Sequence, residues 1–153
     1  VKRDRINNFG YVSRMDNLQA TVLNFRLKNL DKIIVKRRKN FENYKKYLNR
    51  NFVYFPNEEK HQYNSYHTFV VQVKKRDILK KYLKTKNIDT AIHYPIPIHL
   101  QPASKYLGYK KGDFKSAEEQ SKKILTLPIN QFLKESEIKY ISEKVNYFYE
   151  KNL

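Results

Sequence analysis

Two stretches of the sequence carry residue types that could do chemistry. One is HYPIPIHLQPA at residues 93–103, in which three prolines keep much of the backbone out of a helix. It carries His93, Tyr94 and His99, whose imidazole and phenol groups can bind a metal, exchange protons or hydrogen-bond a ligand. From the residues alone, the stretch is a packed connection, a metal site or the wall of a pocket.

A metal site in this stretch is disfavoured by distance and by composition. Five residues separate His93 from His99, and an extended chain that rises ~3.1 Å per residue puts the two side chains ~19 Å apart. Ligands of one ion lie within a few ångströms of each other. The chain also contains no cysteine, and the stretch contains no acidic residue. We therefore expect no metal site.

The other stretch is GYVSR at residues 10–14, just before a predicted helix. The hydroxyl of Ser13, the guanidinium of Arg14 and the free N–H groups of a helix start together suit a phosphate. Ser13 and Asp16 also have the spacing of a capping box, which would serve the helix alone. Both interpretations stay open on the residues themselves.

Elsewhere the sequence shows no pattern typical of catalysis. Ser65 and His67 lack the context of a nucleophile elbow, and the glycines do not form a phosphate-binding loop. Glu118 and Glu119 are typical of a solvated helix face. We therefore predict no catalytic residue within this chain.

The charge and hydropathy of the chain limit the classes of partner. The net charge of +17 suits a nucleic-acid partner, but the basic residues are scattered and no nucleic-acid-binding motif accompanies them. No apolar run approaches the ~20 residues needed to span a bilayer. We therefore expect a cytoplasmic protein that binds neither nucleic acid nor membrane.

Apolar periodicity predicts the elements that position the two stretches. Residues 14–49 predict one long amphipathic helix, or two with a slight break, long enough to bridge two domains. An α/β unit follows, with predicted strands at 52–55, 68–73, 89–94 and 125–129 and predicted helices at 75–86, 102–107, 115–125 and 135–152. The predicted division is 1–50, the end of a large domain with the bridging helix, and 51–153, a small domain.

Two blocks of sequence together resemble one known family. GYVSRMDNLQATVL at residues 10–23 resembles the G-x-N-S-R-(L/M)-D-x-x-Q-A-A-(I/V)-L signature of the DegT/DnrJ/StrS aminotransferases. HYPIPIHLQPASKYLGYKKGDFKSAEEQSKKILTLPI at residues 93–129 is similar to the C-terminal stretch of the same family. The blocks stand in the family's order and cover, with the strand between them, essentially the whole chain.

The resemblance implies a fold and an activity. It implies an α/β chain that forms the small C-terminal domain of a fold type I aminotransferase, preceded by the bridging helix. Such enzymes use pyridoxal 5'-phosphate to aminate keto-sugars of nucleoside diphosphates, usually as homodimers, with glutamate as the expected amino donor. The lysine that binds the cofactor and much of the phosphate site belong to an upstream domain, so this chain alone should not transaminate.

The resemblance also assigns expected roles residue by residue. Ser13 and Arg14 should face the cofactor phosphate, across the dimer interface. His93, Tyr94 and His99 should approach the substrate sugar. Val12 stands where the motif has an asparagine that donates to the phosphate, and a valine side chain cannot donate. The alternative is therefore a truncated or degenerate, non-catalytic member that acts as an interaction module.

Overall fold

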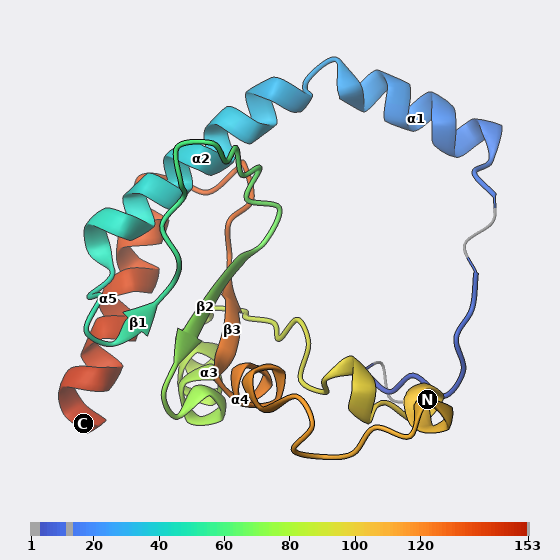
Figure 1. Cartoon of the computed structure of the whole chain (residues 1–153). Helices are drawn as coiled ribbons and strands as arrows, with labels where there is room; N and C mark the ends of the chain where they lie inside the picture. Colours follow the sequence, from blue (N-terminus) through green and yellow to red (C-terminus); the bar gives the residue numbers. More distant parts are fainter. Residues whose placement is uncertain (1–3, 12–13, 153) are drawn as a thin grey trace.

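The computed structural model describes residues 4–11 and 14–152. Its elements are α1 (Asn17–Leu27), α2 (Leu30–Tyr47), β1 (Val53–Tyr54), β2 (Phe69–Val73), α3 (Arg76–Thr85), the 3₁₀ helices η1 (Ile98–Leu100) and η2 (Pro102–Leu107), α4 (Lys115–Lys123), β3 (Ile124–Leu127) and α5 (Glu135–Asn152). The three strands form one antiparallel sheet in the order β1-β2-β3. Figure 1 shows α2 running beside α5, while α1 extends away from the sheet.

The predicted long helix is two helices, as the second form of that prediction had it. The break falls at Lys28 and Asn29, where the backbone N–H of Asn29 donates to the carbonyl of Arg26 at 3.0 Å. The helix α1 starts at Asp16, whose N–H donates to the side chain of Gln19 at 3.1 Å, one half of a capping box. The structure therefore pairs Asp16 with Gln19 in the capping box and not with Ser13, which lies outside the described residues. Among its described side chains, α1 buries none.

The hydrophobic core lies between the sheet and the helices α2, α3 and α5. Apolar side chains recur at three- and four-residue steps along these helices and alternate along β2, so one face of each element is buried. Aromatic rings fill the centre, where Phe69 of β2 lies 5.5 Å from Phe41 and 5.1 Å from Phe55, between ring centroids. The hydroxyl of Tyr44 in α2 donates to the carbonyl of Pro128 at 2.7 Å, which ties α2 to the end of β3.

The predicted strand at 89–94 is wrong. Only Ala91 pairs with a strand, through one bridge to Thr126 of β3. Its N–H donates to the Thr126 carbonyl at 3.2 Å and its carbonyl accepts from the Thr126 N–H at 2.7 Å. No other residue of 89–94 pairs with β3, although Ile92 and His93 both have a backbone N–H. The helix predicted at 115–125 is also shorter, since α4 gives way to β3 at Ile124.

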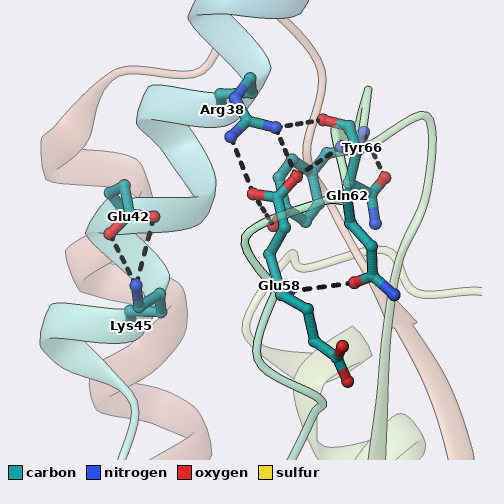
Figure 2. Close-up of polar contacts among 8 residues, drawn as sticks. Arg38, Glu42, Lys45, Glu58, Gln62 and Tyr66 are labelled. Carbon is teal, nitrogen blue, oxygen red and sulfur yellow. Dashed lines mark hydrogen bonds and ion pairs between the residues drawn. The ribbon is translucent and has the colours of Figure 1, made fainter.

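An ion pair holds the loop between β1 and β2 onto α2 (Figure 2). Both terminal nitrogens of Arg38 donate to the carboxylate of Glu58 at 2.7 Å, and one donates also to the carbonyl of Asn64 at 2.8 Å. The guanidinium lies 4.3 Å from the ring centre of Tyr63. The hydrogen bonds from Arg38, followed by that from the Asn64 N–H, lower the pKa of Glu58 to about 2.

We expect this ion pair to stabilise the fold at neutral pH and to lose its effect in acid. Because the folded state lowers the pKa of Glu58 from 4.5, the contribution is complete above that value and disappears as the pH falls through the folded pKa. Urea denaturation at pH 7 and at pH 2.5 measures how much free energy of unfolding is lost in acid. This acid loss should be smaller for Glu58→Gln than for the wild type. Glu42→Gln, which removes an exposed partner of Lys45, is the control and should keep the wild-type acid loss. An equal acid loss in Glu58→Gln and wild type would contradict this assignment.

Candidate functional site

The proline stretch forms the wall of a pocket with a volume of about 880 Å³. The N-terminal segment, β2 and α4 form the rest of it, and its lining includes His93, Tyr94, His99, Gln101 and Phe114. A second pocket of about 850 Å³, between the end of α3 and the start of α5, contains none of the predicted site residues. The stretch is therefore both a packed connection and a pocket wall.

His93 and Tyr94 stand at the start of this wall. The Nδ1 atom of His93 lies 2.9 Å from the hydroxyl of Thr126, so the imidazole is attached to β3. The ring of Tyr94 meets the His93 ring edge-on at 5.4 Å and is 67% exposed. The Tyr94 hydroxyl is therefore available to a ligand, whereas one nitrogen of His93 is already engaged.

His99 lies deeper and has a partner that the sequence did not indicate. It is 7% exposed, its ring lies 4.7 Å from that of Phe114, and its Nε2 atom is 3.1 Å from Oε1 of Glu118. The prediction that Glu118 is solvated is wrong, since it is 8% exposed. Its carboxylate turns inward because Oε1 also accepts the N–H of Gly112 at 2.7 Å. Gly112 has a φ of 101°, a conformation that favours glycine.

Gln101 is a buried residue of the site that the sequence reasoning missed. Its Oε1 atom accepts the N–H of Ile6 at 3.0 Å, and its amide nitrogen donates to the carbonyl of Asp4 at 3.1 Å. The N–H of Ala103 donates to the carbonyl of Ile6 at 3.0 Å, so the N-terminal segment lies against η1 and η2. These partners are more than 90 positions away in sequence, and no local pattern signals such a contact.

The structure does not bring the two predicted groups of site residues together within one chain. Arg14 is exposed and pairs loosely with Asp16 at 3.7 Å, and none of its described contacts reaches the pocket. Ser13, the other predicted phosphate contact, lies outside the described residues. His93, Tyr94 and His99 all line the pocket, so that part of the prediction has a common location.

Two further findings concern metals and membranes. Within residues 4–11 and 14–152, no three side chains of the metal-binding types His, Cys, Asp and Glu lie in one group. In the same part of the chain, no helix has the length and apolarity to cross a membrane.

Comparison with known proteins identifies the family. The model of the DegT/DnrJ/EryC1/StrS aminotransferase family matches residues 1–146. The chain is 38% identical over 143 residues to a Geobacillus stearothermophilus protein named a pleiotropic regulatory protein, covering 92% of this chain and 38% of that one. It is 34% identical over 137 residues to the dTDP-3-amino-3,6-dideoxy-alpha-D-galactopyranose transaminase of Aneurinibacillus thermoaerophilus, covering 90% and 37%. The chain belongs to the DegT/DnrJ/EryC1/StrS aminotransferase family.

A solved structure gives the same result for the fold. The crystal structure of S. venezuelae DesV in complex with a ketimine intermediate superposes with a TM-score of 0.83 and 31% identity, over 91% of this chain and 38% of that one. The fold is therefore the α/β small domain and preceding helices of a sugar aminotransferase. The chain spans somewhat over a third of the length of these relatives.

Proposed function

We propose that the complete protein containing this chain transfers an amino group, from glutamate, to a keto-sugar linked to a nucleoside diphosphate. The observation that carries the proposal is the pocket lined by His93, Tyr94 and His99 in a chain of this family. Hydroxyl and imidazole groups on a rigid, partly apolar wall suit a sugar, because they can hydrogen-bond its hydroxyls while the apolar residues contact its ring.

The proposed cofactor is pyridoxal 5'-phosphate, which when bound supplies an electron sink for amino transfer. This chain fits only the phosphate end of that group. Arg14 is exposed, and its contact with Asp16 is long enough for the guanidinium to turn to an anion. The lysine that carries the cofactor is expected in the upstream domain, so the chain's own part is to hold the phosphate with Ser13 and Arg14 and to present the sugar with the pocket.

The separation of Arg14 from the pocket supports the proposal of a homodimer. A site that uses both groups of residues needs a second copy of the chain or an upstream domain to complete it. The exposed apolar side chains of α1, among them Leu18 and Phe25, are what such a neighbour would cover. The division of the chain at residue 50 and the cytoplasmic location belong to the same proposal.

The test is made on the complete protein. Addition of pyridoxal 5'-phosphate should give the absorbance band of the bound cofactor, and borohydride reduction should link the cofactor covalently to the protein. With a dTDP-linked keto-sugar and glutamate, the enzyme should release 2-oxoglutarate. The 153-residue chain by itself is the control and should do neither. The alternative, a non-catalytic interaction module, is favoured by Val12 in place of the motif asparagine. A complete protein that does not incorporate the cofactor would reject the enzyme and support that alternative.

A further inference from the structure

The pair formed by His99 and Glu118 is the most buried of the acid–base side-chain pairs recorded in the described part of the chain. The two side chains are 5% and 10% exposed, and Nε2 lies 3.1 Å from Oε1. Two polar side chains are rarely taken out of water together unless their hydrogen bonds are satisfied. The position of the protons in this pair therefore determines whether the second ring nitrogen of His99 is a hydrogen-bond donor or an acceptor.

The position of one proton follows from the partners of Glu118. Hydrogen bonding from the Gly112 N–H, and then from His99, lowers the pKa of the Glu118 carboxyl. The carboxylate is therefore ionised at neutral pH and can only accept hydrogen bonds. Nε2 of His99 must then be the donor in this contact. In a neutral imidazole with a proton on Nε2, the other nitrogen, Nδ1, carries a free lone pair.

That second nitrogen has no partner among residues 4–11 and 14–152. The buried side-chain atoms without a partner in this part of the chain are Arg37 Nε, Arg76 Nε and Thr90 Oγ1. Nδ1 of His99 is not one of these atoms, and His99 lines the pocket of about 880 Å³.

We propose that Glu118 is a positioning residue, which holds His99 in the Nε2–H tautomer so that Nδ1 accepts a hydrogen bond from a hydroxyl of the bound sugar. The inference rests on the proposed function, because it names the sugar part of the nucleotide sugar as the ligand. An acceptor nitrogen backed by a carboxylate favours a hydroxyl and disfavours a phosphate, since the diphosphate has only acceptor atoms and negative charge. The hydroxyl of Tyr94 lies in the same lining and offers a second contact to the same sugar.

The tautomer is measured on the chain labelled with ¹⁵N histidine, which contains four histidines. Long-range ¹H–¹⁵N spectra at pH 7.5 should show His99, assigned with His99→Gln, protonated at Nε2 and bare at Nδ1. Glu118→Ala should remove this preference. Glu118→Gln should keep it, because the amide oxygen can accept the same two hydrogen bonds. Glu119→Gln is the matched control, an exposed neighbour that pairs with Lys123 at 3.0 Å, and should change nothing.

Kinetics on the complete protein test the link to the sugar. With a dTDP-linked keto-sugar as the probe, Glu118→Ala should raise KM roughly tenfold with a smaller change in kcat, the effect of one misplaced hydrogen bond. Glu118→Gln should restore most of the wild-type KM. A wild-type His99 protonated at Nδ1 or at both nitrogens overturns the inference, as does an unchanged KM in Glu118→Ala. If that variant does not fold, the wild-type spectrum and Glu118→Gln decide. A wild-type enzyme without transaminase activity overturns the proposed function, whereas a wrong tautomer overturns this inference alone.

Discussion

Phe69→Ala should lower the free energy of unfolding of the chain by about 3–5 kcal/mol, the usual cost of removing a buried phenylalanine. Phe69 is 3% exposed and lies in the middle strand of the sheet. Its ring centroid is 4.9 Å from that of Tyr44, 5.1 Å from that of Phe55 and 5.5 Å from that of Phe41. An alanine leaves these three rings, which come from α2 and the segment after β1, facing a cavity that a rigid sheet cannot close.

The measurement is urea denaturation followed by circular dichroism, with Phe132→Ala as the matched control. Phe132 is 80% exposed, so the same change of side chain there should alter stability by less than about 0.5 kcal/mol. Similar losses in both variants would mean that the aromatic cluster is not the centre of the core. A loss in Phe69→Ala well under 2 kcal/mol would mean that the three rings repack into the space.

The helices could be predicted from the sequence because their periodicity depends on local spacing alone. Residues 75–86 and 135–152 have apolar side chains on one face, and α3 and α5 lie where this pattern puts them. The break in the bridging helix is less visible, because Lys28 and Asn29 are compatible with a helix. What ends α1 there is a hydrogen bond from Asn29 to Arg26, and sequence patterns do not distinguish that turn from a further helical one.

The strand predicted at 89–94 shows where local reasoning fails. Ala91 and Ile92 have the composition of a strand, but pairing depends on which backbone lies alongside. Only Ala91 finds a partner, at Thr126, although Ile92 and His93 have the N–H groups that pairing needs. Strand length is therefore a property of the neighbouring chain as much as of the segment itself.

The candidate site also has features that could be predicted from the sequence and features that could not. The family resemblance predicted that His93, Tyr94 and His99 share one wall, although the stretch is not extended throughout, because His99 lies in the 3₁₀ helix η1. The sequence could not predict that Glu118 is buried, since a glutamate beside another glutamate on a helix is usually solvated. The inward orientation of Glu118 depends on the conformation of Gly112, where φ is 101°. It also depends on the contact with His99, which lies 19 positions away in the sequence. Tertiary contacts of this kind leave no local periodic signal.

Arg14→Ala in the complete protein should weaken the binding of pyridoxal 5'-phosphate by roughly tenfold to a hundredfold, the effect of losing a charge-assisted hydrogen bond to a phosphate. Arg14 is free for this role because it is exposed and its described partner, Asp16, is 3.7 Å away. Titration of the apo-protein with the cofactor, followed by absorbance, gives the dissociation constant. Arg26→Ala, which removes an exposed arginine from the last turn of α1, is the control and should leave it unchanged.

A substitution at Val12 should have the opposite effect on cofactor affinity. If residues 10–14 hold the phosphate, Val12→Asn should tighten cofactor binding, because the asparagine amide adds the donor that valine lacks. Arg14→Lys should fall between wild type and Arg14→Ala, since lysine keeps the charge but not the paired geometry of the guanidinium. Equal affinities in the wild type, Arg14→Ala and Val12→Asn would mean that residues 10–14 do not hold the phosphate. The phosphate would then have to be held by other residues of the complete protein, and the start of α1 would rest on the Asp16–Gln19 contact alone.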